Sequence, residues 1–118
     1  MNDLQIYLIR HGETKWSASG RHTGLTDIPL TERGKQQARA LRDRLQGLDF
    51  QAIYCSPLLR ARETCSLAGF AEKMVLEPDA VEWNYGAYEG LTRGAIEQQH
   101  PAWNIFLHGA PGGESPDQ

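Results

Sequence analysis

The order of strand and helix signals predicts an α/β fold with a mostly parallel sheet. Residues 6–9 and 52–55 are short, continuous apolar runs, the pattern of strands buried on both faces. Helical segments are expected after each run, at about residues 31–46 and 57–68. This strand–helix–strand–helix order is typical of parallel strands joined by right-handed crossovers.

The composition describes one globular domain, residues 1–118. Apolar residues make up 40% of the chain and charged residues 23%, which suits a packed core. The net charge is −3 and no run of Lys or Arg occurs, so we expect no nucleic-acid partner. No apolar stretch approaches the roughly 20 residues of a membrane span, and the N-terminus lacks the basic and apolar regions of a signal peptide.

Cysteine usage bears on location. Cys55 and Cys65 have no metal-ligand spacing around them, and both fall in segments expected to be a strand end and a helix. We therefore predict buried free thiols, which fit a reducing compartment. The sequence predicts a soluble cytoplasmic protein with no membrane partner.

The first apolar run leads directly into Arg10, His11 and Gly12. If a strand ends there, a cation and an imidazole lie at the carboxyl edge of the sheet, where ligands bind in open α/β folds. A structural histidine in a strand-to-loop turn is the alternative, because so short a motif has a real false-positive rate. The polar loop that follows, residues 15–29, is long enough to suggest a functional role.

Thr31 is predicted to cap the first long helix. Ala38, Leu41 and Leu45 then recur at helical spacing, and Gly47 is expected to stop the helix.

Ser56 and Pro57 signal the start of the second helix and place Arg60 in its first turn. Helix N-termini and arginines both attract anions. Because the strand–helix–strand–helix order implies a parallel sheet, we expect Arg60 at the same sheet edge as Arg10 and His11. A surface arginine is the alternative. The remaining expected elements are a short strand at 75–76, an aromatic and acidic stretch at 82–90, a helix from a Thr92 cap to about Gln99, and a loop at 109–118.

The chemistry of these residues points to phosphate. Arg10 and Arg60 can form a clamp, because guanidinium groups match phosphate oxygens with paired donors. A neutral His11 between them can attack phosphorus and form a phosphohistidine, while the two cations stabilise the transferring group. Glu82, in a partly apolar setting, is the candidate acid for the leaving alkoxide, with a solvated glutamate as the alternative. This chemistry requires neither a metal nor a cofactor.

Three ordered blocks of residues resemble the histidine phosphatase superfamily, the phosphoglycerate mutase-like proteins. Together they cover nearly the whole chain. The blocks are Arg10-His11-Gly12-Glu13-Thr14 with Gly20-Arg21-His22-Thr23-Gly24, then Ser56-Pro57-Leu58-Leu59-Arg60-Ala61 with Thr64, and finally Glu82 with Tyr85-Gly86 and Glu89-Gly90-Leu91.

The resemblance implies a role for each candidate residue. It implies His11 as the phosphorylated nucleophile, Arg10 and Arg60 as the clamp, and Glu82 as the proton donor. The substrate-binding candidates are Thr23, Gly24 and Arg93, which match positions that contact substrate in the mutases, together with Ser17 and Tyr85.

The resemblance also implies a three-layer α/β/α sandwich. In the family a second catalytic histidine follows a further strand, beyond the position of Ser115. We therefore expect residues 1–118 to be the N-terminal part of a family domain, incomplete at its C-terminus.

The expected function is hydrolysis of a small phosphomonoester, with sugar phosphates among the candidates. Residues 98–115 lack the basic, Pro-rich insert of the mutases, which favours the phosphatase branch. Two alternatives stay open: mutase-type phosphoryl transfer, and a non-catalytic fragment that binds phosphorylated ligands or a partner chain. Self-association is a further expectation.

Overall fold

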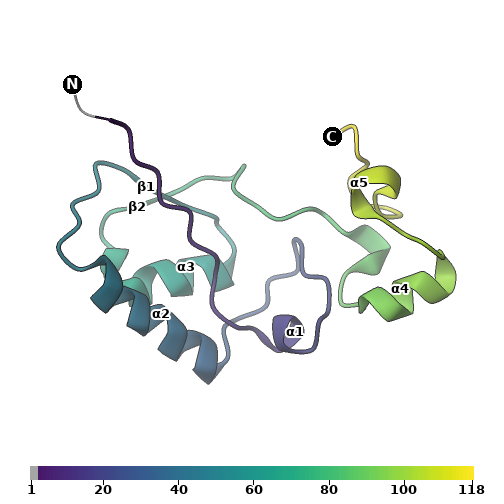
Figure 1. Cartoon of the computed structure of the whole chain (residues 1–118), viewed down its shortest axis with the longest axis horizontal. Coiled ribbons are helices and arrows are strands. Elements are labelled where there is room, and N and C mark those ends of the chain that lie inside the picture. The colour runs from purple at the N-terminus through teal and green to yellow at the C-terminus, as the bar shows by residue number, and fades with distance from the viewer. Residues whose placement is uncertain (1–2) are drawn as a thin grey trace.

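Two short strands pair in parallel and form the sheet (Figure 1). The structure is a computed structural model that describes residues 3–118. Strand β1 spans Ile53–Cys55 and strand β2 spans Met74–Leu76, with Tyr54 opposite Val75. The predicted α/β class, the parallel pairing and both of these strands are confirmed.

Helices make up most of the remaining regular structure. The expected helices at 31–46 and 92–99 are confirmed. The four-residue helix α1 lies inside the loop expected at 15–29, and the four-residue helix α5 lies at 105–108, where no element was predicted. The elements are α1 Lys15–Ala18, α2 Glu32–Leu45, α3 Leu59–Cys65, the π-helical η1 Ser66–Phe70, the 3₁₀-helical η2 Gly86–Tyr88, α4 Arg93–Gln99 and α5 Ile105–His108.

Two threonine caps begin helices at the expected positions. The Thr31 side chain accepts the backbone N–H of Gly34 at 3.0 Å, and the Thr92 side chain accepts that of Ala95 at 3.2 Å. Each hydroxyl satisfies one of the backbone donors that a helix start leaves free.

The helix after β1 starts two residues later than predicted. The Ser56 hydroxyl accepts the N–H of Leu58 at 3.2 Å, which makes a turn instead of a helix cap. The cap comes from a distant loop, since Asp27 Oδ1 accepts the N–H of Leu59 at 2.7 Å. Arg60 still lies in the first turn of α3, as predicted.

The strand predicted at residues 6–9 is not formed. Within the described chain, the backbone of residues 3–11 makes none of the backbone hydrogen bonds that define a strand. A strand needs a partner edge, and the only two described strands pair with each other. The apolar side chains of this segment are exposed as a result, with Leu8 at 93% and Ile6 at 71%.

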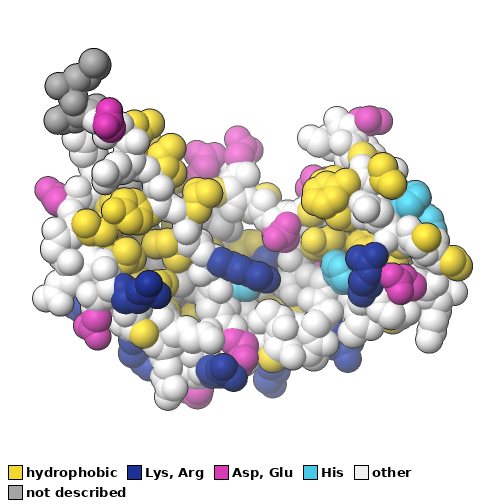
Figure 2. Space-filling view, in the orientation of Figure 1, with side chains coloured by type: hydrophobic (Ala, Val, Ile, Leu, Met, Phe, Trp, Pro, Cys, Tyr) yellow, Lys and Arg dark blue, Asp and Glu magenta, His cyan; other side chains and the backbone are white. Residues whose placement is uncertain are grey.

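Helices α2 and α3 pack together, and α3 contacts β1. Ala38 of α2 and Ala68 of η1 are buried, while Tyr54 and Val75 of the sheet are exposed. Figure 2 shows apolar side chains gathered over the part of the molecule that carries the sheet. The radius of gyration is 16.3 Å, against about 13.5 Å for a compact chain of this length. Much apolar surface therefore stays open.

A cluster of buried apolar residues forms a core in the C-terminal third. Tyr88 of η2, Ile96 of α4 and Trp103 are buried together, and the rings of Tyr88 and Trp103 meet edge to face at 5.5 Å. The Trp103 indole N–H donates to the carbonyl of Gly109 at 2.9 Å, so its polar edge is satisfied.

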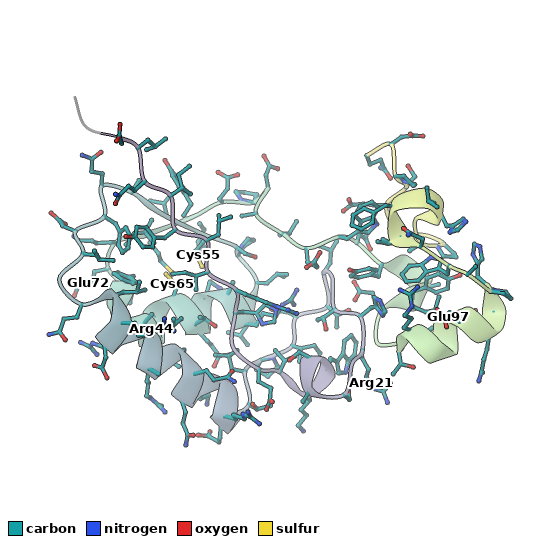
Figure 3. All side chains as sticks on the ribbon, viewed as in Figure 1. Arg21, Arg44, Cys55, Cys65, Glu72 and Glu97 are labelled. Atoms are coloured by element: carbon teal, nitrogen blue, oxygen red, sulfur yellow. The ribbon has the colours of Figure 1, made fainter. Side chains whose placement is uncertain are left out.

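Both cysteines are free thiols, as predicted, and lie side by side between β1 and α3 (Figure 3). Cys55 is buried and Cys65 is partly buried. Burial and the neighbouring Cys55 raise the pKa of Cys65 to about 11. None of the helices in residues 3–118 has the length and apolar character needed to cross a membrane.

Candidate active site

The turn at Gly12, directly after His11, is fixed against α2 and α3. The N–H of Gly12 donates to the Thr64 hydroxyl at 3.0 Å, and that hydroxyl donates to the carbonyl of Arg60 at 2.7 Å. A Cβ atom at Gly12 would lie 2.5 Å from the carbonyl oxygen of Gly34 in α2. Only glycine at position 12 permits this close approach. The position of His11 therefore depends on the contact between Gly12 and Gly34 and on the hydroxyl of Thr64.

The imidazole of His11 is held in one tautomer. Nδ1 lies 2.7 Å from the carbonyl oxygen of Gly12, which can only accept, so Nδ1 carries the proton and Nε2 keeps its lone pair. Burial lowers the pKa of His11 below 6.5, and the charges of Arg60 and Arg10 lower it further, against the Gly12 carbonyl and Glu82, which raise it. The ring is therefore neutral at neutral pH, which is the nucleophilic form.

Arg60 is the most deeply placed charge of the site, with 2% of its surface exposed. Its Nη1 donates to the carbonyl of Thr26 at 3.0 Å, and Nη2 donates to those of Gly24 at 2.7 Å and Thr23 at 3.5 Å. Burial lowers the pKa of the guanidinium, while the neighbouring carboxylates raise it, and an arginine stays charged throughout. Three of its five N–H donors are used, so two remain for an anion.

Arg10 and Glu82 are exposed, in contrast to Arg60. Glu82 Oε1 accepts the N–H of Trp83 at 2.8 Å. We expected an apolar setting for this carboxyl group, and the described residues leave it open to solvent. Arg10, His11, Arg60 and Glu82 nevertheless line one open hollow of about 1190 Å³. Figure 2 shows basic side chains with a histidine below them in the middle of the visible face.

This hollow exceeds the few hundred to 1,000 Å³ of an ordinary ligand pocket. Its other walls are mostly apolar residues of the unpaired segment 4–9 and of β1. The hollow thus combines a polar site with an open apolar face, and only the part near His11 has the chemistry of a catalytic site.

The segment that carries Glu82 is supported by the C-terminal loop. The N–H of Ala87 donates to the carbonyl of Pro111 at 2.8 Å, and that of Glu114 donates to the carbonyl of Asn84 at 2.9 Å. Glu114 Oε1 also accepts the N–H of Asn84 at 3.1 Å. The loop after α5 therefore fixes the backbone that follows Glu82.

Of the five substrate-binding candidates, three lie beside this group of charges. Thr23 and Gly24 accept hydrogen bonds from Arg60, as described above. The ring of Tyr85 lies against Gly24 and edge to face with His22 at 5.0 Å. Burial raises the pKa of the Tyr85 phenol, and Glu82 adds to the effect.

Ser17 and Arg93 are engaged elsewhere. The Ser17 hydroxyl accepts the N–H of Thr14 at 2.8 Å within the cap of α1. The Arg93 guanidinium donates to Glu97 at 2.8 Å and to the carbonyl of Trp103 at 3.2 Å. Both residues stay predictions as substrate contacts.

Sequence reasoning assigned no structural role to three residues that hold the site together. Thr64 lies one helical turn after Arg60, and that spacing was available in the sequence. Asp27 and Glu89 act on backbone groups far away in the chain, and no local pattern signals such contacts. In residues 3–118, no three His, Cys, Asp or Glu side chains are grouped so that they could hold a metal ion.

All three blocks noted in the sequence lie within the match to one family model. The model of the histidine phosphatase superfamily (branch 1) matches residues 6–118. The chain belongs to the histidine phosphatase superfamily.

The names of curated relatives within this superfamily describe several different activities. An acid phosphatase of Mycobacterium tuberculosis is 46% identical, over 94% of this chain and 55% of the relative. A sedoheptulose 1,7-bisphosphatase of Saccharomyces cerevisiae is 37% identical, over 94% of this chain and 49% of the relative. A 2,3-bisphosphoglycerate-dependent phosphoglycerate mutase of Gloeobacter violaceus is 35% identical, over 93% of this chain and 55% of the relative.

Solved structures agree with this assignment. The product of a Mycobacterium tuberculosis open reading frame matches with a TM-score of 0.83 and 42% identity, over 92% of this chain and 56% of that one. A phosphoglycerate mutase of Thermus thermophilus matches with a TM-score of 0.76 and 41% identity, over 92% of this chain and 61% of that one. The chain spans about half the length of the curated relatives it matches.

Proposed function

We propose that the protein is a phosphomonoester hydrolase that works through a phosphohistidine on His11. The observation that carries this proposal is the single tautomer of His11, with Nδ1 bonded to the Gly12 carbonyl and Nε2 free beside two arginines. A neutral imidazole with a free lone pair, next to fixed cations, is suited to attack on phosphorus.

In the first step, Nε2 of His11 attacks phosphorus and the bond from phosphorus to the ester oxygen breaks. The phosphoryl group passes to the ring, and Arg10 with the two remaining N–H groups of Arg60 balances its charge. Glu82 gives its proton to the departing alkoxide, which leaves as an alcohol.

In the second step, water attacks the phosphohistidine. The Glu82 carboxylate takes the proton of that water, the N–P bond breaks, and inorganic phosphate leaves with His11 restored. The proton that Glu82 gives up in the first step thus returns to it from water in the second, and the phosphoryl group ends on the oxygen of that water.

A small phosphorylated metabolite is the proposed substrate. The names of the relatives support this class, since they include an acid phosphatase and a bisphosphatase of a sugar phosphate. The absence of a mutase-like basic insert in residues 98–115 favours hydrolysis over mutase-type transfer. The free thiols of Cys55 and Cys65 support a cytoplasmic location.

The proposal is tested by trapping the phosphoenzyme. The full-length protein is incubated briefly with a ³²P-labelled phosphomonoester, quenched in alkali and digested. We expect alkali-stable, acid-labile label on the peptide that carries His11, and none in His11→Ala. Full turnover by His11→Ala would contradict the nucleophile, and transfer of the label to an acceptor hydroxyl instead of water would identify a mutase.

The role of Glu82 is tested with leaving groups of different basicity. Glu82→Gln should slow hydrolysis of an alkyl phosphate much more than that of an activated aryl phosphate, because only the alkoxide needs a proton on departure. An equal loss for both esters would exclude Glu82 as the acid.

A further inference from the structure

The carboxylate of Glu89 holds the same stretch of backbone that Arg60 holds from the other side. Its two oxygens accept the N–H groups of Gly24 and Leu25, each at 2.8 Å. The carbonyl of Gly24 in turn accepts from Arg60 at 2.7 Å. Gly24 is thus bound at its N–H by an anion and at its carbonyl by a cation.

The contact between Glu89 and this loop is tight. A Cβ atom at position 24 would lie 2.5 Å from Glu89 Oε1 and closer still to the carbonyl oxygen of Trp83. Since neither neighbour leaves space for a side chain, glycine is required here. Glu89 therefore also keeps the loop against the backbone that follows Glu82.

The loop has a further anchor at the start of α3. Asp27 accepts the N–H of Leu59, the residue just before Arg60. The loop 23–27 is consequently fixed from three sides, by Glu89, by the guanidinium of Arg60 and by the first turn of the helix that carries Arg60.

The direction of the Arg60 guanidinium depends on this loop. Three of its N–H groups are bonded to the carbonyls of Thr23, Gly24 and Thr26, all in a segment without helix or strand. If the loop shifts, these carbonyls shift, and so do the two N–H groups left for an anion. Buried polar networks of this kind are sensitive to the loss of any one member.

We propose that Glu89 is a positioning residue for the phosphate clamp: it fixes the Gly24 loop and thereby aims the free donors of Arg60 at the anion. This inference rests on the proposed function. Glu89 itself does not touch the phosphate. The charge of Glu89 also supports that of Arg60, whose pKa it raises.

The test uses inorganic phosphate as the probe and the full-length protein as the sample. Glu89→Gln keeps the size of the side chain, but its amide nitrogen cannot accept one of the two N–H groups. We expect amide hydrogen exchange at Gly24 and Leu25 to become roughly tenfold faster or more. By calorimetry, the Kd for phosphate should rise about 5- to 10-fold.

Glu72→Gln is the matched control. Glu72 is exposed on the turn before β2, and Figure 3 places it at the opposite end of the molecule from Glu97 of α4. This variant should leave both readouts unchanged. Faster exchange in Glu89→Gln with a phosphate Kd within twofold of the original would reduce Glu89 to a purely structural residue and overturn the proposal. If Glu89→Gln does not fold, Glu89→Asp serves instead, because its shorter side chain cannot reach both N–H groups.

A double-mutant cycle separates this inference from the proposed function. Glu89→Gln and Arg60→Lys are compared singly and together by thermal unfolding, which needs neither turnover nor phosphate. If Glu89 acts through Gly24 on Arg60, the two losses in Tm should be clearly less than additive. Additive losses would overturn the coupling of Glu89 to Arg60, whereas coupled losses in a protein that fails to bind phosphate would contradict the proposed function and leave the coupling standing.

Discussion

Thr64 bonds the turn after His11 to the helix that carries Arg60. Its hydroxyl accepts the N–H of Gly12 at 3.0 Å and donates to the Arg60 carbonyl at 2.7 Å. Thr64 is 4% exposed, so water cannot replace the hydroxyl if it is lost. This single side chain sets the spacing between the candidate nucleophile and the deeper half of the phosphate clamp.

Thr64→Val should therefore damage both stability and activity. Valine has the same shape but leaves the Gly12 N–H buried without an acceptor, at a cost of about 1–3 kcal/mol. Urea unfolding measures the free energy of unfolding, and the phosphatase rate is measured on the same sample. Thr64→Ser keeps the hydroxyl and is the control. A Thr64→Val variant as stable and active as Thr64→Ser would show that this hydrogen bond does not position His11.

The pH dependence of the reaction should report the lowered pKa of His11. A lowered pKa keeps the imidazole neutral into mildly acidic pH, so the acid limb of kcat/KM should lie below pH 6.5. Arg10 is one of the charges that lowers this pKa, so Arg10→Ala should move the limb to higher pH. NMR titration of the His11 ring gives an independent measurement. An acid limb that moves to lower pH in Arg10→Ala would contradict the assigned electrostatics.

Arg60→Ala should reduce activity far more than Arg62→Ala. Arg62 lies about 200° around the helix from Arg60, and its Nε donates to the carbonyl of Pro57 at 2.9 Å. Loss of a charge that stabilises the transition state costs roughly 10²–10³ in rate. Steady-state kinetics of the two variants, corrected for the folded fraction, make the comparison. Losses of equal size would remove Arg60 from the clamp.

The 118-residue chain on its own should self-associate through its open apolar face. This face includes Leu8, which is 93% exposed, and Tyr54, which is 68% exposed. Exposed apolar patches of more than a few hundred Å² favour association. Size-exclusion chromatography with light scattering should show oligomers at micromolar concentration, and Leu8→Lys with Tyr54→Lys should reduce them.

Leu107→Lys is the matched control for that experiment, because Leu107 is 73% exposed on α5, outside the apolar face of the sheet. It should change association little. A monodisperse monomer without any substitution would refute the prediction.

The sequence by itself determined the α/β class of the fold. Local signals were sufficient for α2, α4, β1 and β2, because caps, helical spacing and short apolar runs act within a few residues. The sequence proposed Arg10, His11 and Arg60 as site residues from the end of an apolar run and the start of a helix, and the three line one hollow in the structure.

Only the tertiary structure decided how these residues are held. The apolar pattern of residues 6–9 predicted a strand, but a strand also requires a partner edge, which the described residues do not offer. Asp27, and not Ser56, caps α3, and this contact spans 32 positions in the chain. Glu89 accepts the N–H of Gly24 across 65 positions. Such contacts depend on where the folded backbone brings two segments together, and no spacing along the sequence encodes that distance.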